Sequence, residues 1–177
     1  LLVAVPDGAE FRVIDSFSRI VRLGEGLGAS GRLADEAMDR TLEALNICAA
    51  IMARNGVERY HAVATEACRR ARNGDGFIAR VLAETGLKLE SITTEREASL
   101  TFAGCHPLLD DHLPYGLVFD IGGGSTELMW IDQSRIGSDR LVAFHSIPEG
   151  VVTLSERFGS DALDAAAFEA LLTHIDP

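Results

Sequence analysis

The stretch Asp120-Ile121-Gly122-Gly123-Gly124-Ser125-Thr126-Glu127 lies between two apolar runs. This pattern predicts a strand, a glycine turn and a second strand. Three consecutive glycines allow positive φ angles and close approach of a ligand, so their N–H groups can converge on an anion. The Ser125 and Thr126 hydroxyls add donors, and Asp120 stands where it can hold Mg²⁺. A plain glycine hairpin with Asp120 capping the turn is the structural alternative.

Outward from this stretch, the chain alternates strand-like and helix-like segments. An opening meander has its first turn at Pro6-Asp7-Gly8, and Gly56 is expected to end a long amphipathic helix. The predicted strands are 1–5, 10–15, 18–23, 57–64, 87–92, 117–119, 128–131 and 141–146; the predicted helices are 35–55, 66–72, 75–85, 94–103, 151–158 and 164–175. The sequence therefore predicts two successive α/β units.

Composition narrows the possible partners. The 177 residues contain 16 Lys and Arg against 27 Asp and Glu, a net charge of −11. Such acidity disfavours broad binding to nucleic acid or to an anionic membrane, and no apolar run is long enough to span a bilayer. Three cysteines without a C-x-x-C pair favour neither a zinc cluster nor a disulfide framework, so we expect a reduced, cytoplasmic compartment.

Two familiar phosphate motifs do not fit the glycine stretch, because the Walker loop and the dinucleotide fingerprint both lead into a helix. A phosphate loop within a β-hairpin resembles instead that of the sugar kinase, chaperone ATPase and actin superfamily. Three segments in order, 64–73, 92–104 and 120–127, resemble the family of exopolyphosphatases and guanosine pentaphosphate phosphohydrolases. The likeness extends to 21–27 and 147–152 and so runs through nearly the whole chain.

The resemblance implies an α/β fold of the actin-like ATPase (ribonuclease H-like) class, in which two lobes each have a mixed sheet flanked by helices. We expect a first lobe over residues 1–112, without its first strand and phosphate loop, and the start of a second lobe over 113–177. Both lobes would then be truncated. Across the cleft between them, Glu97 would face Asp120 and Glu127.

The resemblance also implies roles for individual residues. Glu97 matches the family's catalytic base, which activates water, although Thr94 and Glu97 also fit a capping box that fastens a helix start. Asp120 matches a position that holds Mg²⁺, and Glu127 matches a second metal ligand or a water-orienting group. By itself, a strand carboxylate such as Glu127 would be expected to face solvent. The glycine turn Gly122, Gly123, Gly124, Ser125 and Thr126 is expected to bind phosphate.

Arg69 matches the family arginine that grips phosphate bidentately. A solvated helix face is the plainer explanation for the arginines around it. For Cys68 and Cys105, burial in the core is expected rather than nucleophilic chemistry. The family pattern I-S-G-x-E-E-A is altered here, because Thr94 replaces its glycine and Arg96 its first glutamate.

The expected function is a hydrolase that removes terminal phosphate from inorganic polyphosphate, guanosine pentaphosphate or both. Water activated by Glu97 would attack with the help of Mg²⁺. The alternatives are a non-catalytic sensor of polyphosphate or (p)ppGpp and another phosphotransferase of the same superfamily. The resemblance further implies a homodimer for the full-length protein.

Overall fold

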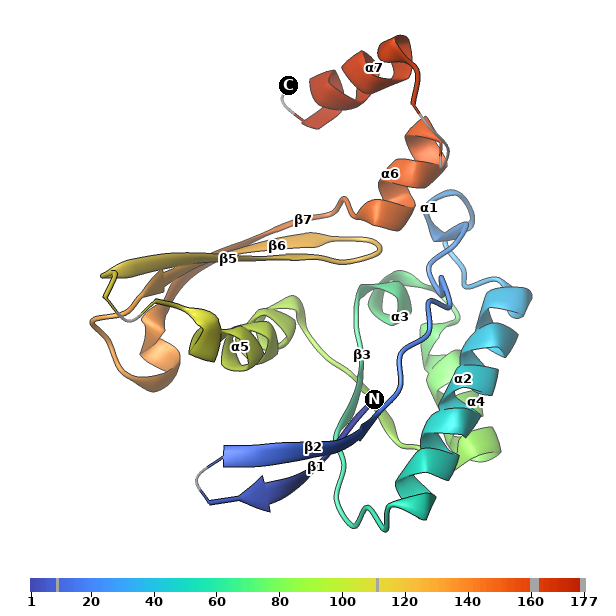
Figure 1. Ribbon diagram of the computed structural model, residues 1–177. Coiled ribbons are helices and arrows are strands. Elements are labelled where there is room, and N and C mark those ends of the chain that lie inside the picture. The colour runs from blue at the N-terminus through green and yellow to red at the C-terminus, as the bar shows by residue number, and fades with distance from the viewer. Residues whose placement is uncertain (9, 111, 160–162, 176–177) are drawn as a thin grey trace. The chain divides into compact units, whose positions relative to one another are not determined.

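The structure, a computed structural model, describes residues 1–8, 10–110, 112–159 and 163–175. Its contacts divide the chain into two compact units, Leu1–Ser91 and Ile92–Pro177, called unit 1 and unit 2 below. Both units combine helices with small sheets, as predicted (Figure 1). The boundary between complete lobes at residues 112 and 113 stays a prediction.

Unit 1 begins with an antiparallel hairpin of β1 (Leu2–Asp7) and β2 (Glu10–Ser16). Gly8 has a φ of 65° at its turn, which glycine adopts without steric cost. The predicted third strand at 18–23 is wrong, because these residues form no strand. Arg22 has a left-handed φ of 48°, and Arg40 donates to the Val21 carbonyl, so the extended path is broken there.

The rest of unit 1 packs helices against a two-stranded parallel sheet. Its elements are α1 (Leu27–Ser30), α2 (Asp35–Arg54), β3 (Ala62–Ala64), α3 (Glu66–Arg70), α4 (Gly74–Thr85) and β4 (Leu89–Ser91). The long helix ends where predicted, and Gly56 has a φ of 60° just beyond it. Only the last part of the predicted strand 57–64 is a strand. Phe77 and Val81, exposed by 2% and 0%, lie at the centre of the core.

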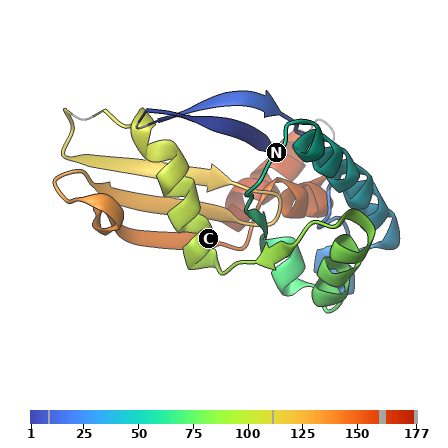
Figure 2. The ribbon, with the colours of Figure 1, turned by 90° about the horizontal axis from the view of Figure 1, so that it is seen from below.

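Unit 2 is a three-stranded antiparallel sheet in the order β5-β6-β7, with α5 across one face (Figure 2). Its elements are α5 (Thr94–Cys105), the 3-10 turn η1 (His106–Leu108), β5 (Tyr115–Ile121), β6 (Thr126–Asp132), the 3-10 turn η2 (Gly137–Arg140), β7 (Leu141–Ile147), α6 (Val151–Phe158) and α7 (Ala165–Ile175). Ala98 and Phe102 of α5 pack on Val118, Met129 and Ile131 of the sheet. This one-sided core fixes α5 over the three-stranded sheet.

The opposite face of the same sheet is apolar and exposed. Leu117 and Phe119 of β5 are 54% and 62% exposed, and Trp130, the cross-strand partner of Leu117, is 48% exposed. Alternation along the strands sends these side chains away from α5. The residues of β5 are therefore apolar on both faces of the strand, although only one face is buried.

Helices α6 and α7 are joined by a small charged cluster. The Glu149 carboxylate accepts from Arg157 of α6 at 3.2 Å and meets the His174 ring of α7 at 2.8 Å. The hydrogen bond from His174, with further help from Thr153 and Arg157, holds the pKa of Glu149 below its usual value. None of the helices in the described part of the chain is long and apolar enough to cross a membrane.

Candidate phosphate and metal site in unit 2

Residues Gly122 to Ser125 form the turn between β5 and β6, as the sequence predicts. The Gly122 N–H donates to the Ser125 carbonyl at 2.9 Å and closes the turn. None of the three glycines has a positive φ, so the turn does not use this conformational freedom of glycine. A Cβ on Gly122 would lie 3.2 Å from the Ser125 oxygen, so close packing within the turn favours glycine at that position.

Helix α6 approaches the glycine turn closely. The Val151 N–H donates to the Gly122 carbonyl at 3.0 Å, and the Val152 N–H donates to the Gly123 carbonyl at 2.8 Å. A Cβ on Gly150 would lie 2.5 Å from the Gly122 oxygen, far inside van der Waals contact. The absence of a side chain at Gly150 thus lets the first turn of α6 touch the glycine turn.

The same contacts set the direction in which the turn presents its amides. No peptide bond in the described part of the chain is cis, and in a trans peptide the C=O and N–H point in opposite directions. Because the Gly122 and Gly123 carbonyls point at α6, the N–H groups of Gly123 and Gly124 point away from it. These two amides find no acceptor among the described residues, so they are available to an anion.

The two hydroxyls of the stretch differ in their surroundings. The Thr126 hydroxyl donates to the Glu149 carbonyl at 2.8 Å and so links β6 to the segment before α6. Ser125 is 6% exposed and lies beside the available amides. The phosphate-binding role of both residues stays a prediction.

Asp120 and Glu127 are directly opposite each other on β5 and β6, so their side chains share one face of the sheet. Glu127 is only 2% exposed, and the expectation that it faces solvent is wrong. Its alternation with Met129 and Ile131 puts it on the face that α5 covers. Two hydroxyls hold the carboxylates: Thr101 donates to Asp120 Oδ2 at 3.0 Å, and Ser146 donates to Glu127 Oε1 at 2.8 Å.

Helix α5 brings Glu97 to the same place. Its N-cap is Thr93, whose hydroxyl accepts from the Arg96 N–H at 3.2 Å, so Thr94 lies inside the helix. The predicted capping box of Thr94 and Glu97 is therefore wrong by one residue. Glu97 lies four residues before Thr101, and such neighbours have Cβ atoms about 6 Å apart on one helix face. Since Thr101 contacts Asp120, all three predicted carboxylates lie in one region of unit 2.

The donor set fits a hard divalent cation. No group of three or more His, Cys, Asp and Glu suited to a metal occurs among the described residues, but Mg²⁺ is commonly held by one or two carboxylates with water and substrate phosphates. Within that part of the chain, no basic side chain forms an ion pair with Asp120 or Glu127. A cation between them would offset the cost of burying Glu127 beside a like charge.

The remaining predicted site residue lies in unit 1. Arg69 is a half-buried residue of the short helix α3. Its neighbour Cys68 is 5% exposed, and burial raises the pKa of its thiol, which keeps Cys68 protonated near neutral pH. The expected burial of Cys68 is confirmed, Cys105 is partly buried, and the three cysteines are all free.

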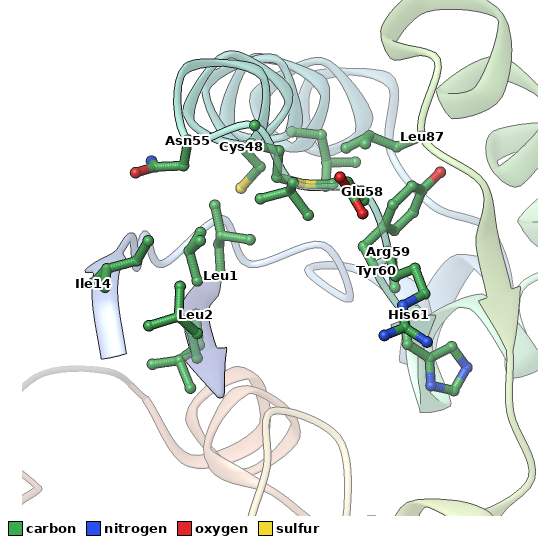
Figure 3. Close-up of a pocket in the computed structure, with 18 of the residues that line it drawn as sticks. Leu1, Leu2, Ile14, Cys48, Asn55, Glu58, Arg59, Tyr60, His61 and Leu87 are labelled. Atoms are coloured by element: carbon green, nitrogen blue, oxygen red, sulfur yellow. The ribbon is translucent and has the colours of Figure 1, made fainter. Parts of the chain in front are cut away.

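A groove of about 940 Å³ also lies in unit 1, between the hairpin and the opposite wall formed by 57–63 (Figure 3). Leu1, Leu2 and Ile14 line one side, and Cys48 of α2 lines its floor. Its lining includes none of the residues predicted to bind phosphate or metal. We therefore place the candidate site in unit 2, at the glycine turn.

Comparison with known proteins gives the family. The model of the Ppx/GppA phosphatase family matches residues 2–176. The chain belongs to this family. The membership of the Ppx/GppA family that the sequence motifs predicted is thereby confirmed.

Ppx/GppA relatives include proteins with different named substrates. The chain is 39% identical over 145 residues to "Exopolyphosphatase 2" of Mycobacterium tuberculosis, covering 79% of this chain and 44% of the relative. It is 32% identical over 166 residues to "Guanosine-5'-triphosphate,3'-diphosphate pyrophosphatase" of Photobacterium profundum, covering 91% and 31%. The chain thus spans less than half the length of these curated relatives.

A solved Ppx/GppA-like structure supports the fold. The crystal structure of an exopolyphosphatase from Cytophaga hutchinsonii matches with a TM-score of 0.84 and 26% identity, covering 99% of this chain and 55% of that one. The predicted fold class, α/β of the actin-like type found in this family, is confirmed. Sequence reasoning missed Thr101, Ser146 and Gly150. The spacing of Thr101 from Glu97, one helical turn, is the signal that could have identified the first of them.

Proposed function

We propose that this chain supplies the water-activating and metal-binding side of a phosphoanhydride hydrolase that removes terminal phosphate from inorganic polyphosphate or guanosine pentaphosphate. The observation that carries the proposal is the placement of Glu97, Asp120 and Glu127 around one glycine turn in one compact unit. The family membership and the names of the relatives support the reaction class.

Each group has a defined task in this reaction. Glu97 accepts a proton from water as the water oxygen attacks the terminal phosphorus, and the bond from that phosphorus to its bridging oxygen breaks. The Gly123 and Gly124 amides and the Ser125 hydroxyl bind non-bridging oxygens. The resemblance to the family also assigns phosphate binding to Arg69, a residue of unit 1. Asp120 and Glu127 hold Mg²⁺, which when bound neutralises charge on the transferred group. The products are inorganic phosphate and a substrate shorter by one phosphate.

The test is Glu97→Gln in the full-length protein, assayed for phosphate release from both substrates. Loss of general-base catalysis should lower kcat by about a hundredfold or more. Glu95→Gln is the matched control, because Glu95 is an exposed carboxylate in the first turn of the same helix. Near wild-type turnover by Glu97→Gln would reject the assignment. Tight substrate binding without multiple turnover by the wild type would favour a sensor.

A further inference from the structure

Two hydroxyl groups flank the carboxylate pair from opposite elements. Thr101 reaches Asp120 from α5, and Ser146 reaches Glu127 from β7. Each hydroxyl donates to one oxygen of its carboxylate. Asp120 and Glu127 are cross-strand neighbours of like charge and repel each other. The Thr101 and Ser146 hydroxyls hold the two carboxylates in place against this repulsion.

Thr101 behaves differently from other helical threonines of this chain. A threonine within a helix commonly donates to the carbonyl four residues earlier. Thr41 does so to Ala37 at 2.7 Å, and Thr85 does so to Val81 at 2.8 Å. The Thr101 hydroxyl donates to Asp120 instead. The local bond is given up for a contact with the carboxylate.

We propose that Thr101 is a positioning residue, which fixes Asp120 relative to the helix that carries Glu97, and that Ser146 fixes Glu127 in the same way. This inference rests on the proposed function. Because α5 is rigid over the single turn from Glu97 to Thr101, the hydrogen bond to Asp120 sets the separation between the proton acceptor and the metal-binding carboxylate. Hydrogen bonds to charged groups are the stronger kind, and the outer partners of metal ligands typically change metal affinity by about 10- to 100-fold.

The first test measures metal binding by the 177-residue chain without substrate. Mn²⁺ is the probe, and bound ion is followed by electron paramagnetic resonance. Thr101→Val keeps the shape of the side chain and removes the donor, so Mn²⁺ affinity should fall about tenfold. Thr101→Ser restores the hydroxyl and should recover affinity to within about threefold of wild type. Ser146→Ala should weaken binding to a similar extent.

Two reference variants separate this inference from the proposed function. Thr41→Val removes a comparable helical hydroxyl in unit 1 and should leave Mn²⁺ affinity unchanged. Asp120→Asn should abolish binding. If Asp120→Asn fails to bind and Thr101→Val binds as wild type does, the positioning role alone is overturned. If Asp120→Asn binds normally, or the wild type binds no Mn²⁺, the metal assignment and the positioning role both fall.

A second measurement covers effects on folding. Urea unfolding of Thr101→Val and Thr101→Ser shows whether either chain is partly unfolded under the conditions of the titration. In the full-length protein, Thr101→Val should lower kcat about tenfold with little change in KM, because the shift affects proton transfer more than substrate binding. Equal kcat in folded Thr101→Val and wild type would also overturn the proposal.

Discussion

The absence of a side chain at Gly150 allows α6 to contact the glycine turn. It has an extended backbone and lies against the Gly122 and Gly123 carbonyls, and its N–H donates to the Thr153 hydroxyl at 2.7 Å. Any side chain here would push the first turn of α6 off the glycine turn. Glycine is required by proximity at this position and not by an unusual φ.

Gly150→Ala should therefore destabilise the protein by about 1 to 3 kcal/mol, because the new methyl would lie 2.5 Å from a backbone oxygen. Urea unfolding measures this loss. Gly76→Ala is the control: it is an exposed residue of α4 with nothing within 4 Å of its Cβ position, and alanine should stabilise that helix by about 0.5 to 1 kcal/mol. Equal effects of the two variants would contradict the account.

Residue roles were only partly predictable at this scale. Thr93 and Thr94 are both good N-cap residues, and sequence alone could not decide which one ends the extended segment before α5. The choice moves Glu97 from the third to the fourth helical position and thereby away from the capping box. For Glu127, the burial could have been inferred, since it alternates with Met129 and Ile131.

At the scale of elements, strands and helices with strong local signals were predicted well. The hairpin turn at Gly8, the α2 helix and the α6 helix all occur where the apolar spacing and the glycines place them. The strand predicted at 18–23 does not form, because alternation of apolar residues does not show whether a partner strand is present. Arg40 donates a hydrogen bond to the Val21 carbonyl instead. Strand 57–64 is shorter than predicted for the same reason: only Ala62–Ala64 pairs with β4.

The contact of α7 with α6 should depend on pH through Glu149. Its pKa is lowered in the folded protein, so its contribution is fully present above its unfolded value of about 4.5 and is lost as the pH falls through the lowered folded value. Glu149→Gln should cost about 0.5 kcal/mol near pH 7, the size typical of a partly exposed ion pair. The cost should be smaller at pH 3 than at pH 7, because protonation of the carboxylate at low pH removes the ion pair.

Thermal unfolding at both pH values measures this difference. Glu169→Gln on α7 is the control, because Glu169 is exposed and its side chain has no ion pair among the described residues. It should cost the same at both pH values. A cost for Glu149→Gln that grows toward acid would contradict the direction of the pKa shift.

At the scale of the whole molecule, charge dominates the response to solution conditions. A net charge of −11 on 177 residues produces self-repulsion that salt screens within a Debye length of about 10 Å at 0.1 M. The melting temperature should therefore rise by a few degrees as KCl increases from about 20 to about 200 mM. NaCl should act identically, and a falling melting temperature would show that surface ion pairs outweigh the repulsion.

Family and fold class followed from the sequence because the motifs keep their order and spacing over the whole chain. The assembly of the site did not. Nothing in the sequence states that Thr101 and Ser146 reach Asp120 and Glu127 from different elements, since such contacts depend on how α5 crosses the sheet. These contacts depend on how the helix packs on the sheet, which local sequence patterns do not show.

The bonds from α6 to the glycine turn also have an electronic consequence. The oxygen of Gly122 and the N–H of Gly123 belong to one conjugated peptide group, and the same holds for Gly123 and Gly124. When the Val151 and Val152 amides draw electron density toward those oxygens, the opposite N–H protons become more positive. Through these two peptide groups, the partial positive charge at the N-terminus of α6 increases the positive charge of the amides on the far side of the turn. An anion bound there is stabilised by the helix dipole without contacting the helix.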